Sequence, residues 1–280
     1  MSLQRIETGS EGSFLRSRRP FIVAVCVAPD AGSTREVAHR SIAEGADIVE
    51  LNLAQLSEHE IARLDVPRDL PYYAVCRRRR FMSVYGLEPG SLPLRNDELR
   101  MRVCLDMVQR GARAMDMECD TFSHKENRIP ESLPSDLSEF AASGEVVQAQ
   151  KLVMKQCKQA GAEVILSCHA GRPLEQKQAV TLAGLMAERG GDLIKIVTQH
   201  SDPEYAARLI GVITEVRRVV LVPFILISIG PRSALLRVLG SYVGNAGVFC
   251  RAEGPSASFR DHPPISSLRE IWRLLPPGNV

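Results

Sequence analysis

The sequence predicts a single-domain (β/α)8 TIM barrel, and three observations lead to this fold class. Eight short apolar runs alternate with segments of helical pattern from residue 21 onward. The composition shows no second regime that would divide the 280 residues into two domains. A barrel of this type typically takes about 250 residues, which suits a catalytic domain over 21–280.

The first half of the chain supplies four of the strands. They are predicted at 21–27, 46–51, 71–76 and 111–119, with helices from Ser33, from Ser57 and over 96–110 between them. Ser33 and Glu36 have the spacing of a capping box, and Ser57 is a typical N-cap residue. Residues 1–20 are polar and irregular, so we expect a flexible or loosely docked arm before the first strand.

The second half supplies the other four strands. They are predicted at 163–169, 190–199, 222–229 and 246–250, with helices at 145–159, 173–189, 203–217, 232–239 and 265–275. The segment 120–143 contains Pro130, Pro134 and many polar residues, which predicts an inserted excursion at the loop end of the barrel. An open doubly wound sheet is the second choice. It is less favoured because no glycine-rich dinucleotide turn follows the first strand.

The composition favours a cytoplasmic protein with a small-molecule partner. Hydrophobic residues make up 45% of the chain, no apolar run approaches the ~20 residues of a membrane span, and the first twenty residues contain no apolar signal region. The net charge of +2, and the absence of interleaved aromatic residues in the run Arg77–Arg80, argue against nucleic acid as a partner. Seven cysteines without CxxC spacing predict free thiols, and they lack the spacing of metal ligands.

Lys195 lies in the middle of a run with the composition of a buried strand. Leu193, Ile194, Ile196 and Val197 flank it, as in a parallel strand covered on both faces. An ammonium in apolar surroundings loses hydration, which lowers its pKa toward the range where the neutral amine can attack a carbonyl and form a Schiff base. The alternative is a structural lysine whose stem lies on apolar surface while its head reaches water.

Ionisable residues at the strand ends give Lys195 a set of potential partners. In a (β/α)8 barrel the C-terminal ends of the strands converge on one mouth, where the chemistry takes place. The residues predicted there are Glu50, Arg77, Glu118, His169 and Lys195, with Arg237 following the seventh strand in its helix. Each of these residues alone is a common structural feature, but six ionisable groups at one mouth predict an active site.

Seven short motifs occur in order along the chain, at the predicted strand ends and in the last helices and loops. They are Ala46–Glu50, Pro71–Arg77, Asp116–Glu118, Val164–His169, Gly191–Ile196, Leu236–Gly240 and Ser256–Ala257. Together they resemble the type I 3-dehydroquinate dehydratases, the Schiff-base enzymes of the shikimate pathway of aromatic amino acid biosynthesis. The resemblance implies a (β/α)8 barrel, usually a homodimer. It also implies a hydro-lyase that converts 3-dehydroquinate to 3-dehydroshikimate without a metal or an organic cofactor.

The resemblance also implies the catalytic roles. Lys195 matches the lysine that forms an imine with the substrate ketone, and His169 matches the histidine that moves protons. An iminium acidifies the adjacent C–H because the carbanion is delocalised as an enamine. An imidazole near neutrality can then take this proton and return it to the departing hydroxyl.

The substrate-binding residues follow from the same motifs. Arg237 and Ser256 match residues that contact the carboxylate of the substrate, and Glu50 and Arg77 match residues that face its hydroxyls. The substrate-binding candidates are therefore Glu50, Arg77, Glu118, Arg237, Ser256 and Arg260.

The chain departs from the family pattern around the substrate. Asn52 stands where the family commonly has an arginine, and Phe81 aligns with a glutamate near the catalytic histidine. Residues 168–170 read Cys-His-Ala instead of Asn-His-Asp, and Arg260 replaces a glutamine. The imine-forming residues are kept and the substrate-reading residues are altered. This pattern leaves open a divergent dehydratase, a dehydratase of another keto acid, and a homologue of weak activity.

Three further readings remain open. A class I aldolase would use the same lysine chemistry on the same barrel. A phosphate-binding barrel is suggested by Ile229–Ser233, whose N–H groups open a helix, although only Gly254 follows the last strand. A barrel kept for interaction alone would have a folded but inactive site.

Overall fold

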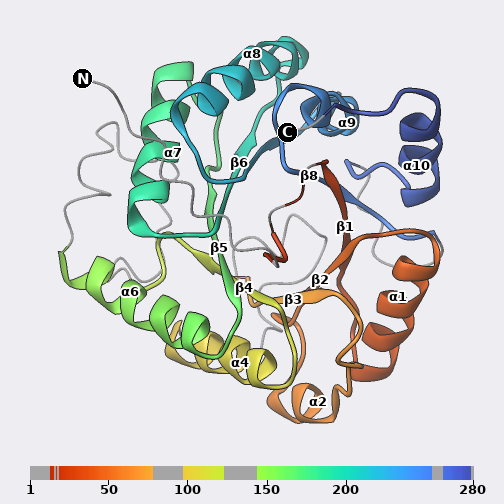
Figure 1. Ribbon diagram of the computed structural model, residues 1–280, viewed down its shortest axis with the longest axis vertical. Coiled ribbons are helices and arrows are strands. Elements are labelled where there is room, and N and C mark those ends of the chain that lie inside the picture. The colour runs from red at the N-terminus through yellow and green to blue at the C-terminus, as the bar shows by residue number, and fades with distance from the viewer. Residues whose placement is uncertain are drawn as a thin grey trace.

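The computed structural model describes residues 13–15, 17, 19–77, 97–122, 144–253 and 261–278, and it contains eight parallel strands surrounded by helices (Figure 1). The strands are β1 (Phe21–Cys26), β2 (Ile48–Asn52), β3 (Tyr72–Val75), β4 (Ala114–Glu118), β5 (Glu163–His169), β6 (Leu193–Gln199), β7 (Phe224–Ile229) and β8 (Gly247–Cys250). Their order in the sheet is β7-β6-β5-β4-β3-β2-β1-β8. The sheet therefore curls into a nearly closed cylinder, which confirms the predicted (β/α)8 barrel.

The helices lie outside the strands and cover the cylinder (Figure 1). Those in the described residues are α1 (Ala31–Ala43), α2 (Glu58–Arg63), α4 (Asp97–Gln109), α6 (Gly144–Gln159), α7 (Gln176–Arg189), α8 (Pro203–Val219), α9 (Ser233–Val243) and α10 (Ile265–Leu274). Helix α10 buries Ile265, Leu268 and Trp272 against the outer face of β1 and β8. The spacing of these residues puts them on one side of a helix. Full burial of each such apolar side chain contributes roughly 1.5 to 3 kcal/mol.

Helix α1 begins earlier than predicted. The sequence pattern placed its start at Ser33, but the helix begins at Ala31 and Asp30 is the N-cap. The Asp30 carboxylate accepts hydrogen bonds from Ser33 N at 2.8 Å and from Ser33 Oγ at 3.0 Å. Aspartate is as good a cap as serine, and the spacing alone does not rank two cap residues three positions apart.

Helix α9 ends later than predicted. The helix was predicted to end at Leu239, yet it continues through Gly240 to Val243. A Cβ at Gly240 would lie 2.5 Å from Asn245 Nδ2. Gly240 therefore serves close packing against Asn245 and does not end the helix.

The segment before β1 is docked where the structure describes it. Leu15 is only 1% exposed, and Leu15 N donates to Glu163 Oε2 at 2.8 Å. Ser13 Oγ also bonds the Glu163 carboxylate, and Arg113 lies over the Phe14 ring at 5.6 Å. A flexible or loosely docked arm is the prediction for 1–20, and most of that stretch lies outside the described residues; within it, Leu15 is buried beside Phe21, Val23 and Tyr73.

The barrel closes between β7 and β8 through a side chain. Asn245 Oδ1 accepts from Leu226 N at 2.9 Å and Asn245 Nδ2 donates to Leu226 O at 3.0 Å. One backbone bond, from Ala246 N to Phe224 O at 2.8 Å, lies beside them. The amide of Asn245 thus replaces the strand-to-strand ladder that joins the other neighbours.

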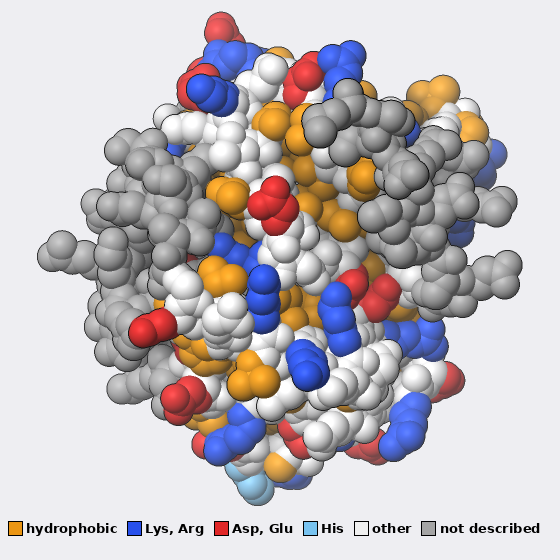
Figure 2. All heavy atoms as spheres, turned by 60° about the vertical axis from the view of Figure 1, so that its left-hand side comes forward, with side chains coloured by type: hydrophobic (Ala, Val, Ile, Leu, Met, Phe, Trp, Pro, Cys, Tyr) orange, Lys and Arg blue, Asp and Glu red, His pale blue; other side chains and the backbone are white. Residues whose placement is uncertain are grey.

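The surface carries charges of both signs, and the cysteines are free thiols. Figure 2 turns the side of α6 and α7 toward the viewer and shows basic and acidic side chains interspersed. On this side Lys158 Nζ pairs with Asp192 Oδ1 at 2.9 Å. All seven cysteines are buried free thiols, as predicted. Within the described ranges, every helix is too short or too polar to cross a bilayer.

Candidate active site

Four inward-facing side chains, one from each even-numbered strand, form a layer inside the barrel. We call it the Lys195 layer, and its members are Glu50 from β2, Asp116 from β4, Lys195 from β6 and Phe249 from β8. The register of the ladders puts these four at one level. Barrels of this class are filled by such layers of four, usually with bulky branched residues. Three charged members make this layer a candidate site.

Lys195 contacts the three other members of its layer. Its Nζ lies 2.5 Å from Asp116 Oδ2, 3.3 Å from Glu50 Oε2 and 5.0 Å from the centre of the Phe249 ring. The side chain is 2% exposed. Apolar surroundings were expected for this ammonium, but the structure supplies two carboxylates. A charge buried this deeply requires such partners.

Lys195 and Glu50 lie deeper than the strand ends at which they were predicted. Lys195 is the third residue of β6, and Glu50 is the third residue of β2. Glu118 and His169, in contrast, are the last residues of β4 and β5. A reaction at Lys195 would therefore take place within the barrel, below the mouth.

Arg77 connects the Lys195 layer to the mouth. Its guanidinium donates to Asp116 Oδ2 at 2.8 Å and Oδ1 at 3.2 Å, and lies 3.5 Å from Glu50 Oε2. Ser167 Oγ adds a bond to Asp116 Oδ1 at 2.6 Å. Burial raises the pKa of Asp116, but Arg77 and Lys195 outweigh it and hold the pKa below its usual value. Asp116 is therefore a carboxylate at neutral pH.

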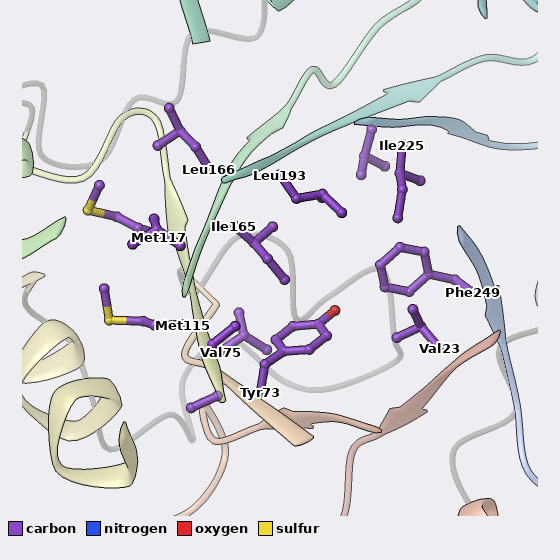
Figure 3. Packing of buried hydrophobic residues seen from close by; sticks show 14 of the residues in the cluster. Val23, Tyr73, Val75, Met115, Met117, Ile165, Leu166, Leu193, Ile225 and Phe249 are labelled. Carbon is purple, nitrogen blue, oxygen red and sulfur yellow. The ribbon is translucent and has the colours of Figure 1, made fainter. Parts of the chain in front are cut away.

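Tyr73 reaches Glu50 from the next layer down. The layer below consists of Val23, Tyr73, Ile165 and Ile225, and Figure 3 shows these side chains turned into the barrel, with the Tyr73 hydroxyl in their midst. This hydroxyl donates to Glu50 Oε2 at 2.5 Å. The short distance is typical of a hydroxyl bonded to a carboxylate.

Glu118 is occupied by a buried arginine that the sequence analysis did not single out. Arg100 from α4 pairs with Glu118 and with Asp97, and donates to Cys76 O from Nε at 2.8 Å and from the second nitrogen at 2.6 Å. The other Glu118 oxygen lies 3.9 Å from Arg77. Glu118 is therefore paired with Arg100 and lies near Arg77, and it is not a member of the Lys195 layer.

His169 lies above the Lys195 layer, toward the mouth. It follows Ser167, the ladder partner of Lys195, by two residues, which is about 7 Å along one face of a strand. Burial lowers the pKa of His169 well below its usual value, and Arg77 and Lys195 act in the same direction, while Asp116 opposes them. The imidazole is therefore neutral near pH 7 and able to accept a proton.

Arg237 lies on the β8 side of the site. It is buried in α9, and its Nε donates to Asp261 O at 2.8 Å. Asp261 directly follows the segment 254–260, which contains Ser256 and Arg260. Both of these predicted substrate residues lie outside the described residues, as does Phe81. Asn52, the other departure from the family pattern, is buried and accepts a bond from Ala54 N at 3.1 Å.

The turn at Ile229–Ser233 does not favour the phosphate reading. Gly230 has φ of 140°, and a Cβ there would lie 2.1 Å from His200 O. Ser233 N donates to Gly230 O at 3.1 Å. Packing against His200 therefore accounts for the glycine at this position, and a phosphate is not needed to explain it.

Asp116, Ser167 and Tyr73 belong to the candidate site by their contacts, and the sequence analysis did not name them as site residues. Each lies on the same strand face as a predicted residue, because side chains repeat that face every second position. Asp116 precedes Glu118 by two residues, Ser167 precedes His169 by two, and Tyr73 precedes Arg77 by four. Extending the predicted strand ends backward by this period would have found all three.

The arrangement can support covalent chemistry on a carbonyl compound. Lys195 offers an amine held among carboxylates that can exchange its proton, and a neutral imidazole lies above it. Amine, base and buried guanidinium together suit an imine followed by proton transfer at the neighbouring carbon.

Comparison with known proteins identifies the family of this chain. The family model described as Type I 3-dehydroquinase matches residues 22–276. No curated protein matches the sequence. A 3-dehydroquinate dehydratase structure from Geobacillus kaustophilus HTA426 has a TM-score of 0.70 and 19% identity, covering 92% of this chain and 91% of that one. A type I 3-dehydroquinate dehydratase from Clostridium difficile, described with covalently modified comenic acid, has a TM-score of 0.70 and 18% identity over 92% and 93%. These structures share the barrel fold.

Proposed function

This chain belongs to the type I 3-dehydroquinase family, and on that premise we propose that it dehydrates 3-dehydroquinate to 3-dehydroshikimate through an imine on Lys195. The observation that carries the proposal is the buried Lys195 amine, 2.5 Å from Asp116 and 3.3 Å from Glu50. A lysine among apolar strands and carboxylates is suited to exchange a proton and attack a ketone.

Imine formation begins when the Lys195 ammonium passes a proton to a neighbouring group, for which Glu50 and Asp116 are in reach. The neutral amine attacks the ketone carbon, so that a C–N bond forms and the carbonyl oxygen becomes a hydroxyl. The hydroxyl takes up one further proton, the second that this oxygen receives from the nitrogen by way of its neighbours, and leaves as water. The balance is ammonium plus ketone giving iminium plus water.

Elimination follows at the carbons next to the iminium. His169 removes a proton from the carbon beside the iminium, and the electron pair is held as an enamine. The enamine then expels the β-hydroxyl, which takes the proton back from His169 and leaves as water. Hydrolysis of the conjugated iminium releases the product and restores Lys195. The lowered pKa of His169 supports its role as the base, since the imidazole is neutral before the step.

The substrate would be held from the mouth of the barrel. Arg77 and Glu50 would face its hydroxyls, with Glu118 supporting Arg77, and Arg237, Ser256 and Arg260 would receive its carboxylate. A guanidinium suits this role because it binds a carboxylate in a forked geometry. We further propose that the protein acts in the cytoplasm as a homodimer, in keeping with the family.

The test is to incubate the protein with 3-dehydroquinate and borohydride. Mass spectrometry should find a reduced adduct on the peptide that contains Lys195, and without borohydride a conjugated enone absorbance should appear. Lys195→Ala should lose both signals, because the nucleophile is removed. Lys158→Ala, which removes an exposed lysine paired with Asp192, is the control and should keep both.

A second variant separates the two catalytic roles. His169→Ala should still form the Lys195 adduct but lose roughly 10²- to 10⁴-fold in turnover, the usual contribution of a general acid and base. His59→Ala, on the exposed face of α2, should turn over normally. An adduct on another lysine contradicts the proposal, and a carbon–carbon cleavage product would point to an aldolase.

A further inference from the structure

The Tyr73 hydroxyl is a polar group in a layer of the core that is otherwise aliphatic. The other members of its layer, Val23, Ile165 and Ile225, are aliphatic and buried. A phenylalanine would fill the same volume, and a buried hydroxyl is unfavourable unless it is bonded. The Tyr73 hydroxyl donates a hydrogen bond to Glu50 Oε2 at 2.5 Å, and this bond accounts for the hydroxyl.

The oxygen that Tyr73 binds is the one that faces the reacting amine. Glu50 Oε2 lies 2.5 Å from the Tyr73 hydroxyl, 3.3 Å from Lys195 Nζ and 3.5 Å from an Arg77 nitrogen. Burial raises the pKa of Tyr73 well above its usual value, and Glu50 and Asp116 act in the same direction. Tyr73 is therefore a proton donor to Glu50 at every working pH.

We propose that Tyr73 is a positioning residue that acts through Glu50, holding its carboxylate and limiting how strongly that carboxylate retains the Lys195 ammonium. This inference rests on the proposed imine chemistry. A carboxylate that already accepts a short hydrogen bond has less negative charge to offer a second donor. With the hydroxyl in place, Glu50 Oε2 is a weaker acceptor for the Lys195 ammonium than a bare carboxylate would be, so the ammonium gives up its proton more readily to become the attacking amine.

The remaining charged groups around Lys195 are not changed by removing this hydroxyl. Asp116 faces the amine from β4, Arg77 follows β3 and lies against both carboxylates, and His169 acts from the end of β5. Because the proposed reaction also protonates and deprotonates His169, the pH dependence of turnover would combine the effects of His169 and Lys195. Imine formation measured by itself reports Lys195 and its partners.

The experiment compares Tyr73→Phe with Tyr72→Phe. Both variants lose one hydroxyl from β3, but the Tyr72 hydroxyl faces outward to Met107 O at 3.4 Å. The rate of imine formation with 3-dehydroquinate is measured by rapid mixing and borohydride trapping from pH 5 to 11. In Tyr73→Phe the rate should be roughly tenfold lower than in the wild type at the acid end of this range, and the difference should narrow toward the alkaline end. Tyr72→Phe should follow the wild type.

The outcomes separate this inference from the function on which it rests. A wild-type protein that forms no Lys195 adduct overturns both. A normal adduct with the same pH profile in Tyr73→Phe overturns the role of Tyr73 alone. An equal loss of rate at every pH in Tyr73→Phe also overturns it, because a purely structural defect would not depend on the protonation of Lys195.

Discussion

At the residue scale, Asp116 is the carboxylate that holds two buried cations in place. It accepts from both Arg77 nitrogens and from Ser167, and it lies 2.5 Å from Lys195. Removing one member of a buried ion pair leaves an uncompensated charge, which costs more than the pair itself contributes. Arg77 and Lys195 would both lose their closest partner if this charge were removed.

We therefore expect Asp116→Asn to lower the free energy of unfolding at pH 7 by about 3 to 5 kcal/mol. The pKa of Asp116 is lowered in the folded state, so its contribution is complete above the usual aspartate pKa and is lost as the pH falls through the folded value. The gap between wild type and variant should thus shrink below about pH 4. Urea unfolding at several pH values measures it.

The control for this substitution is Asp106→Asn. Asp106 makes an exposed ion pair with Arg110 at 3.4 Å, so its loss should change the free energy of unfolding by less than about 1 kcal/mol. A similar small effect at Asp116 would mean that the buried cations find other partners.

The candidate site residues that could be predicted from sequence are ionisable residues within or at the end of an apolar run. Lys195 inside an apolar run and His169 at the end of one stand out by contrast with their neighbours. Arg100 does not, because arginine is common in helices. Its burial depends on the position of Glu118 and of Cys76 O, which only the folded chain brings together.

At the scale of elements, Arg100 fixes α4 to the strands it covers. It bonds the backbone at the end of β3 and the last carboxylate of β4, and its partner Asp97 accepts from Phe122 N at 2.7 Å. The end of β3 leads directly into Arg77. The position of α4 is thus coupled to the guanidinium that binds Asp116.

Replacing Arg100 by leucine should lower the free energy of unfolding by about 3 to 5 kcal/mol, because Glu118 is left as a buried charge without this partner. Arg102→Leu in the same helix removes only an exposed pair with Glu58 at 3.0 Å and should cost less than about 1 kcal/mol. Urea denaturation of both variants makes the comparison. Equal changes in the free energy of unfolding for the two variants would show that Arg100 does not anchor α4 to the strands.

Strands and helices were predictable because their patterns are local. The fifth predicted strand agrees with β5 in both its ends, and the others differ from the structure by a few residues. The differences at Asp30 and at Gly240 arise where the sequence offers two possible roles or two possible caps. Asp30 and Ser33 can both cap a helix, and a glycine can end a helix or allow close packing.

At the scale of the whole molecule, the join between β7 and β8 depends on Asn245. Its amide satisfies both backbone groups of Leu226 in the buried interior. The barrel fold could be predicted from eight alternating units, but this join could not. It depends on how β7 and β8 meet after the other six strands have set the curvature.

Asn245→Ala should lower the free energy of unfolding by about 2 to 5 kcal/mol, because two buried backbone groups lose their partner. Hydrogen exchange should locate the effect, with the Leu226 amide exchanging faster while the amides of β4, on the opposite side of the barrel, keep their rate. Thr214→Ala, which removes an exposed bond to Gly211 O, is the control and should change neither. Unchanged exchange at Leu226 would mean that water or a moved strand takes the place of the side chain.

A cylinder that parts at this join becomes a sheet with two free edges. The open backbone of an edge strand can pair with the edge of another molecule, which is how many sheet proteins begin to aggregate. In this protein the amide of Asn245 keeps the Leu226 groups engaged and so keeps that edge covered. One polar side chain, outside the Lys195 layer, thereby removes a strand edge through which unfolding copies of the chain could aggregate.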